Sequence, residues 1–523
     1  MRRDFGWLPL LAACLAACGR CGGHPAATPG TSIEELLPAS APAVAIVPSI
    51  SHVMRDARGL AKVVARFPEG ETVGGILDAL TAQLGFDPGD EKALARAGID
   101  GQRPAALVFE GGEPWLVVPV VDRGRFEAMA RKLIASRLGA DKTEQRGEVT
   151  VFSSTAGPAA ALAFTAGYGM LGSGPAAAEE LGRALGRKKE ERLANEPLFA
   201  RAQRTFGADW DVEAYLPAGS PYLPSRPLPG RAFVAGLFYR EGRLAARVMS
   251  LLSVAEGTGM STFAMAAGQP LVSLLPPADP LFARLGGNPG GLTGLWQNLV
   301  PPDVRKALAT AKIDADKEVL GNVEPGIVAS VGLAKHLDLS AAPSLDPRVQ
   351  NPFRYVTLDV FAKVRDPKAA LATLKKLGEL PPGLGVSTGR TKIGETDVDT
   401  FHYALGDGPS VALVGNTLAV TGGEGEMKEA LARLAGKAPG YIPPPWMRRA
   451  LLGQVSDGAV FDTSALRLAI EAIPASAYGG LTGLTIRSLV RRFANPLIWV
   501  GPITATVDVG PDALVIDADL SFR

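Results

Sequence analysis

The stretch Tyr355-Val-Thr-Leu-Asp-Val-Phe-Ala-Lys-Val364 alternates between two sets of side chains along its whole length. Successive side chains of a β-strand point to opposite faces of a sheet, so the alternation predicts a half-buried strand. One of its faces carries Val356, Leu358, Val360, Ala362 and Val364. Asp366 follows where a helix needs a capping side chain. The apolar face of that helix is marked by Ala370, Leu374 and Leu377.

The same strand and helix pattern occurs earlier in the chain, where a strand at 115–121 leads to Asp122. The helix after Asp122 has the apolar face Phe126, Met129, Ala130 and Leu133. Hairpins follow in both places, and Gly415-Asn416 and Ala166-Gly167 supply turn residues that tolerate positive φ. Strands are predicted in addition at 43–48, 104–110, 168–173, 271–275, 326–333, 396–403, 409–414, 417–421 and 513–522, and helices at 176–186 and 425–435. In strand 513–522 the predicted core face is Leu514, Ile516, Ala518, Leu520 and Phe522.

Matches between the two halves keep their order along the chain. Pro42–Pro48 pairs with Pro270–Pro276, the strand before Asp122 with the strand before Asp366, and Gly147-Glu148 with Gly394-Glu395. An ordered series of matches is the sign of an internal repeat. We therefore expect a first α+β repeat at 40–256 and a second at 268–523. Amphipathic strands that run in hairpins favour antiparallel sheets covered on one face by helices.

The second repeat is predicted to carry a helical insertion near 463–495. Its apolar side chains are expected to pack on the body of the repeat: Leu466, Leu468, Ile470, Ile473, Ile486, Leu489 and Val490.

The first residues of the chain form a secretory leader. Met1-Arg2-Arg3 supplies positive charge, and an almost wholly apolar run extends from Trp7 to Ala17. The run ends in Leu15-Ala-Ala-Cys18, which resembles the lipobox of bacterial lipoproteins. The resemblance implies that 1–17 is a signal peptide and that Cys18 receives the acyl chains, such as palmitate. Leu11-Ala-Ala-Cys14 also fits the pattern but leaves a shorter apolar run.

Residues 18–39 then form the lipidated start and a flexible tether rich in Pro, Gly, Ala and Thr. Cys18, Cys21 and His24 together offer an alternative metal or redox site. The rest of the chain resembles uncharacterised families of duplicated α+β lipoproteins, and that resemblance implies a fold rather than an activity. Gly19 after the lipid cysteine favours the outer membrane, facing the periplasm or the cell surface.

Composition narrows the class of partner. The formal net charge is +1, from 54 basic and 53 acidic residues, and no basic run stands out, so nucleic acid is not expected as a partner. All 3 cysteines lie in the first 21 residues, so a disulfide is not expected in the folded body. No apolar run after the leader is long enough to span a bilayer.

Several short motifs point to chemistry, each with a simpler interpretation. Gly167-Tyr-Gly169-Met-Leu-Gly172 fits a dinucleotide-binding pattern, but hairpin glycines explain it better, and no cofactor is expected. Gly385-Val-Ser387-Thr-Gly389 fits the nucleophile elbow of hydrolases. Its partners would be Asp399 and His402, which alternation places on opposite faces of one strand.

Metal sites are not expected either. The histidines, His24, His52, His336 and His402, show no ligand spacing. The pairs Asp397/Asp399 and Asp517/Asp519 share a strand face and fit either Ca²⁺ or a solvated sheet surface. We expect a non-enzymatic envelope lipoprotein that binds a protein, an apolar ligand or cell-wall material through a sheet face or a cleft between repeats. The alternatives are a serine hydrolase centred on Ser387 and a structural scaffold of an envelope assembly.

Overall fold

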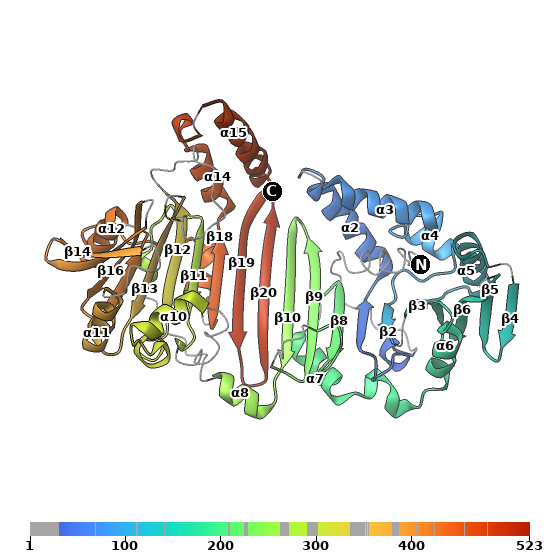
Figure 1. The fold of residues 1–523 in the computed structure, drawn as a ribbon. Coiled ribbons are helices and arrows are strands. Elements are labelled where there is room, and N and C mark those ends of the chain that lie inside the picture. The colour runs from blue at the N-terminus through green and yellow to red at the C-terminus, as the bar shows by residue number, and fades with distance from the viewer. Residues whose placement is uncertain are drawn as a thin grey trace. The chain divides into compact units, whose positions relative to one another are not determined.

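The structure is a computed structural model of the whole chain, shown in Figure 1. It describes residues 31–67, 70–110, 113–140, 142–155, 157–207, 210–223, 229–261, 271–289, 302–334, 351, 353, 355–378, 386–403, 406–422, 424–453, 455–478 and 480–523. These residues form two compact units. Unit 1 extends to Glu256 and includes Asp512–Phe522, and unit 2 is Gly257–Pro511 with Arg523. The segment 513–522, which the repeat pattern assigns to the second copy, therefore lies in unit 1.

Unit 1 is built on one antiparallel sheet. Its strands follow each other across the sheet in the order β20, β10, β9, β8, β1, β2, β3, β7, β6, β5, β4. Their bounds are β1 Ala43–Val47, β2 Ala105–Phe109, β3 Pro114–Pro119, β4 Lys142–Arg146, β5 Val149–Ser154, β6 Gly157–Thr165, β7 Tyr168–Ser173, β8 Val212–Pro217, β9 Ala232–Arg240, β10 Arg243–Leu251 and β20 Ala513–Phe522.

Helices pack on both faces of this sheet, because its central strands are apolar on both sides. Val108 and Val117 lie in the core under α6 (Ala177–Gly186) and α7 (Pro197–Phe206). Leu107 and Leu116 point the other way, into the core under the remaining helices of the unit. Those helices are α2 Ile50–Val64, α3 Glu71–Leu84, α4 Glu91–Arg96 and α5 Arg123–Leu138. The expectation of helices on one face only is therefore wrong for unit 1.

The strands of unit 2 are antiparallel and follow one another in the order β19, β18, β11, β12, β13, β17, β16, β15, β14. The strands are β11 Leu281–Leu285, β12 Ile327–Leu333, β13 Val356–Lys363, β14 Val386–Ile393, β15 Thr396–Tyr403, β16 Gly406–Val414, β17 Thr417–Thr421, β18 Asp457–Phe461 and β19 Val500–Val509. Its helices include α10 Pro302–Thr310, α11 Pro367–Gly378, α12 Glu424–Leu434, α13 Arg448–Leu452, α14 Thr463–Glu471 and α15 Gly480–Ala494. Helix α8, Val254–Ser261, follows β10.

The two units repeat one strand order. The sequence β8, β1, β2, β3, β7, β6, β5, β4 in unit 1 corresponds strand by strand to β18, β11, β12, β13, β17, β16, β15, β14 in unit 2. The α+β class is confirmed, and most predicted strands and helices agree with the structure to within a few residues.

Two local predictions are wrong. The segment 271–275 holds a short 3-10 helix, Val272–Leu274, and the opening strand of unit 2 is β11, which begins ten residues after Leu271. In β20 it is Val515 that packs on the main core of unit 1, whereas Ile516 is exposed. The strand has apolar side chains on both faces, so alternation alone does not say which face is buried.

Candidate functional site

Unit 1 has a partly open cavity of about 110 Å³ beneath α2, α3, α4 and α5. Every residue that lines the cavity is apolar. The lining is Ile50, Met54, Leu80, Leu84, Phe86, Pro88, Leu94, Ile99, Ala105, Leu116, Val118, Phe126, Met129, Ala130, Leu133 and Leu171. Strands β2, β3 and β7 form its floor, and the helices form its walls.

The cavity lies where two hydrophobic clusters meet. One cluster joins α4 and α5 to the sheet through Leu94, Phe126 and Ala130. The other joins α2 and α3 to each other and to β9 through Met54, Leu80 and Tyr239. Each helix pair packs well within its own cluster, and the space between the two clusters remains unfilled.

An apolar cavity of this kind suits a hydrocarbon group. Buried water needs polar partners, and an engineered apolar cavity of roughly 150 Å³ stays dry and binds benzene. The lining supplies no side-chain hydrogen-bond donor or acceptor. A short alkyl segment or a small ring fits the size and chemistry of the space, and a charged or strongly polar group does not.

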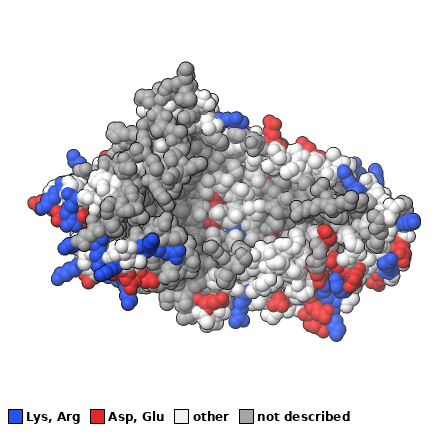
Figure 2. All heavy atoms as spheres, viewed as in Figure 1, with Lys and Arg blue, Asp and Glu red and all other residues white. Residues whose placement is uncertain are grey.

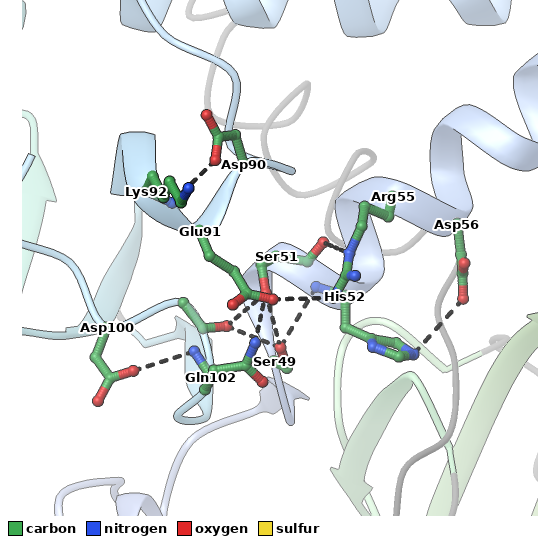
Figure 3. A network of polar contacts seen from close by, with 11 residues as sticks. Ser49, Ser51, His52, Arg55, Asp56, Asp90, Glu91, Lys92, Asp100 and Gln102 are labelled. Carbon is green, nitrogen blue, oxygen red and sulfur yellow. Dashed lines mark hydrogen bonds and ion pairs between the residues drawn. The ribbon is translucent and has the colours of Figure 1, made fainter. Parts of the chain in front are cut away.

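A polar network fixes the start of α2 beside the cavity (Figure 3). Ser49 caps the helix by accepting a hydrogen bond from the backbone N–H of His52. The hydroxyls of Ser49 and Ser51 both donate to the carbonyl oxygen of Gly101, at 2.8 and 3.2 Å. Gln102 Nε2 donates to Ser51 Oγ at 3.4 Å. These contacts tie α2 to the loop before β2, so Ile50 and Met54 hold a fixed place in the cavity wall.

Two arginines of α2 hold the outer wall of the cavity. Arg55 forms an ion pair with Glu91 at 3.2 Å. Arg58 pairs with Asp87 and also donates to Thr81 Oγ1 at 2.9 Å. Phe86 and Pro88, which line the cavity, flank the Asp87 carboxylate in sequence. The ion pairs therefore link α2 to the segment that borders the cavity.

Ser51, His52 and Asp56 lie in this network without forming a catalytic arrangement. His52 Nε2 is 3.8 Å from Asp56 Oδ2. Figure 3 shows the imidazole turned towards Asp56 and away from Ser51. The Ser51 hydroxyl donates to Gly101, whereas a nucleophilic serine donates to its base.

The three residues of the candidate hydrolase site, Ser387, Asp399 and His402, lie on β14 and β15. Ser387 and His402 are cross-strand partners in β14 and β15, so they share a sheet face. The Ser387 side chain is exposed, and His402 Nε2 lies 3.0 Å from Thr400 Oγ1. Asp399 faces the other side and is held by Arg390 through two hydrogen bonds of 2.8 and 3.1 Å. The carboxylate is therefore not available to orient His402, and Ser387 lies on a strand instead of a strand-to-helix turn.

The glycine motif in β7 has a packing explanation. Gly167 has φ of +78° in the β6–β7 turn, a conformation that glycine adopts easily. A Cβ on Gly169 would lie 2.5 Å from the Phe126 ring, and one on Gly172 would lie 3.0 Å from Ala177 Cβ. The glycines allow α5 and α6 to approach the sheet closely, one on each face.

The paired aspartates face cations of their own sheets. Asp517 binds Arg247 at 2.6 Å, Asp519 binds Arg243 at 2.5 Å, and Lys392 Nζ lies 3.8 Å from Asp397. Acidic and basic side chains are interspersed on the surface drawn in Figure 2. Within the described ranges no group of three or more His, Cys, Asp and Glu side chains has a metal-binding arrangement. Cys14, Cys18, Cys21, His24, His336 and Gly385 lie outside the described residues.

The sequence patterns missed a buried row of polar side chains in unit 2. Ser330, Asp359, Thr421 and Ser410 stand directly opposite one another across β12, β13, β17 and β16. All four are almost completely buried. The buried face of β13 is thus the one that carries Asp359, opposite to the all-apolar face that the alternation marked. The corresponding row of unit 1 is Val108, Trp115, Gly172 and Ala161.

Burial raises the pKa of Asp359 to about 7. Arg433, with Nη2 3.8 Å from Asp359 Oδ1, opposes this rise, and the nearby carboxylates of Asp279, Glu426 and Glu429 add to it. Neither carboxylate oxygen of Asp359 has a hydrogen-bond partner among the described residues. Ser330 Oγ donates instead to Asp279, at 2.6 Å. The Asp359 carboxyl is therefore the proton-binding group of this row, inside the core of unit 2. The polar row could have been predicted only from the pairing register of the four strands, because the sequence of a single strand does not show which residues lie opposite it.

Comparisons with known proteins give little further guidance. No model of a protein family and no curated protein matches the chain. Among solved structures the chain is similar to crystal form IV of TP0453, with 15% identity over 42% of this chain and 81% of that one, at a TM-score of 0.25. Crystal form III of TP0453 gives 14% identity over 44% and 82%, at a TM-score of 0.26. TM-scores this low do not show a shared fold. In the described part of the chain, no helix combines the length and hydropathy needed to cross a bilayer.

Proposed function

We propose that this protein is a lipid-anchored, non-enzymatic envelope protein that binds an apolar ligand in the cavity of unit 1. The observation that carries the proposal is the cavity, because all of its lining residues are apolar and it is set between helices that pack into two separate clusters. Clefts of mainly apolar lining are the usual binding sites for small apolar molecules. A single alkyl chain, with its polar end outside, is the ligand class that fits.

The anchor rests on the sequence alone. The basic start, the apolar run and Leu15-Ala-Ala-Cys18 support lipidation at Cys18 and a place in the envelope, which we propose to be the outer membrane. The repeated strand order of the two units supports a second proposal, that the chain arose by duplication of one α+β unit. On this proposal the two copies have diverged at equivalent positions, with an apolar row at Trp115 in the first and a polar row at Asp359 in the second.

Intact-mass spectrometry of the membrane-extracted protein tests the anchor. We expect the wild-type chain to lack residues 1–17 and to carry a lipid mass that Cys18→Ala loses. A free amino terminus, or an unmodified Cys18 thiol, would contradict the anchor. The Cys18, Cys21 and His24 cluster would then be examined for metal.

Calorimetric titration with hexanoic acid and with hexanol tests the cavity in the full-length chain. Both compounds should bind with similar affinity, because the lining recognises the chain and not the head group. Met129→Trp fills the cavity from α5 and should weaken both by roughly tenfold or more, since each buried methylene contributes about 0.8 kcal/mol. Ala128→Trp, on the exposed side of the same helix, is the matched control and should bind as the wild type does.

Thermal unfolding of the two tryptophan variants shows whether both remain folded. If Met129→Trp is folded and binds hexanol as tightly as Ala128→Trp does, the ligand enters elsewhere and the cavity is a packing void. If neither variant nor the wild type binds either compound, the apolar-ligand proposal is wrong.

A further inference from the structure

The helical segment of unit 2 from α14 to the short helix Asn495–Ile498 forms an arm, which we define as residues 463–499. Figure 1 shows α14 and α15 extending beyond the strands of their own unit. The two helices contact each other, and both contact Asn495–Ile498. The base of the arm is fixed, because Thr463 Oγ1 donates to the carbonyl oxygen of Val500 at 2.8 Å and Asp462 caps α14.

Helix α14 contacts β19 at its base, but four large apolar side chains of the arm remain exposed. Thr463 is the one residue of α14 that is buried. The exposed fractions are 58% for Leu468, 53% for Leu489, 45% for Ile498 and 38% for Trp499. Leu468 and Leu489, which the sequence places against the body of the repeat, are therefore open to solvent. Such a group of exposed apolar side chains marks an interaction surface.

The charge of the arm identifies the kind of surface that it meets. No acidic residue occurs from Ala472 to Val507, and α15 carries Arg487, Arg491 and Arg492. The last two are exposed. The one acidic side chain within the arm, Glu471, is already paired with Arg467 at 2.6 Å. The unpaired charge next to Leu489 is therefore positive.

We propose that the arm docks on an anionic lipid surface. Helices that lie in a membrane interface combine leucine, isoleucine or tryptophan with arginine or lysine, and tryptophan is enriched at the depth of the head groups. Leu468, Leu489 and Ile498 enter the acyl region, Trp499 lies at the depth of the head groups, and Arg491 and Arg492 bind the phosphates. A partner protein or a second copy of this chain would need acidic side chains opposite these arginines, and the arm has none to offer to a second copy.

The test places a fluorescent label on the arm in the full-length chain. A single cysteine is introduced as Leu489→Cys or Leu468→Cys in a full-length chain that carries Cys14→Ser, Cys18→Ser and Cys21→Ser, so that no other thiol takes the label and no lipid anchor is present. The control is Leu371→Cys on α11, because Leu371 has the same 53% exposure as Leu489 but lies outside the arm. Each cysteine carries an NBD label, and the vesicles contain phosphatidylglycerol or phosphatidylcholine alone.

With phosphatidylglycerol vesicles, the labels at 489 and 468 should shift to the blue and be quenched by lipid-borne doxyl groups. The label at 371 should stay accessible to aqueous iodide. Arg491→Ala with Arg492→Ala should raise the lipid concentration needed for the shift on the order of 30-fold, because each basic residue near an anionic surface contributes about one fivefold step.

Three results would overturn the proposal. One is equal quenching at 371 and 489, another is an equal response to phosphatidylcholine, and the third is a blue shift without lipid that grows with protein concentration. The last would assign the arm to self-association. The readout is local to the labelled side chain, so it succeeds or fails independently of the lipid on Cys18 and of ligand binding in unit 1.

Discussion

Asp359 shows how one residue makes the stability of unit 2 depend on pH. An unfolded chain releases the Asp proton near its ordinary pKa of about 3.9, whereas burial holds the proton in the folded state up to about 7. Between these values the folded state binds more protons than the unfolded state. The free energy of unfolding therefore falls as pH rises through this window, and it is highest below the unfolded pKa.

We predict that Asp359→Asn removes this dependence. From about pH 5 to about pH 8 the wild-type unit 2 should lose on the order of 3 kcal/mol, and the asparagine variant should lose much less. Urea unfolding at the two pH values, followed by hydrogen exchange in β13, measures the difference. Asp397→Asn is the control, because the Asp397 side chain is 60% exposed and should leave the pH dependence unchanged. The same slope in wild type and Asp359→Asn would contradict the assignment.

At the scale of the element, β7 shows why its glycines are needed. Gly169 lies against the Phe126 ring, which also packs edge-on to Phe164 at a ring-centre distance of 6.0 Å. A methyl group at this position displaces the ring and moves α5 away from the sheet. The result is a loss of packing in the cluster that forms one side of the cavity.

Gly169→Ala is therefore expected to destabilise unit 1 by about 1–3 kcal/mol, as overpacking in a core does. Gly182→Ala is the control within the same unit. Gly182 lies inside α6 with open space around its Cα, so alanine there should stabilise by about 0.5–1 kcal/mol. Chemical denaturation of both variants measures the change in the free energy of unfolding, which should be negative for Gly169→Ala and positive for Gly182→Ala. Equal effects from the two substitutions would mean that contact with Phe126 does not decide the role of Gly169.

Element prediction from the sequence succeeded where a local signal is strong. The caps Asp122 and Asp366 are confirmed, since Asp122 accepts from the N–H of Arg125 and Asp366 from those of Lys368 and Ala369. The turns at Ala166-Gly167 and Gly415-Asn416 are confirmed by the registers of their hairpins. These features depend on neighbouring residues alone, so the sequence contains them completely.

The cavity and the polar row could not be predicted in the same way. The cavity lies between two groups of helices whose side chains are ordinary core residues, and only their packing leaves the space. Asp359 has apolar neighbours on both sides in sequence, and the other polar residues of its row come from three other strands. Both features are products of tertiary arrangement, which overrides the local pattern.

At the scale of the whole molecule, β20 belongs to a unit that is otherwise built from the first half of the chain. It pairs with β10 from Arg243↔Ser521 to Leu251↔Ala513. Arg247 and Arg243 add ion pairs across these strands to Asp517 and Asp519. The edge of the unit 1 sheet at β10 is thus covered by residues from the carboxyl end of the chain.

Removal of residues 513–523 should therefore weaken unit 1. We expect amide exchange in β10 to accelerate by roughly tenfold or more, while exchange in β14 and β15 of unit 2 stays unchanged. Hydrogen exchange measured by mass spectrometry resolves these strands. Removal of Arg523 alone is the control, because it leaves β20 intact. Unchanged exchange in β10 after the longer truncation would contradict this role of β20.

The late position of β20 has a consequence for biosynthesis. A ribosome releases β10 well before β20, and at about 5–20 residues per second the delay is on the order of tens of seconds. During that time the nascent chain has an unpaired strand edge, which is a template for aggregation. A chaperone that binds extended apolar segments would protect it, and a prematurely terminated chain would keep it open. The β10 edge of unit 1 thus stays unpaired until β20 has been made.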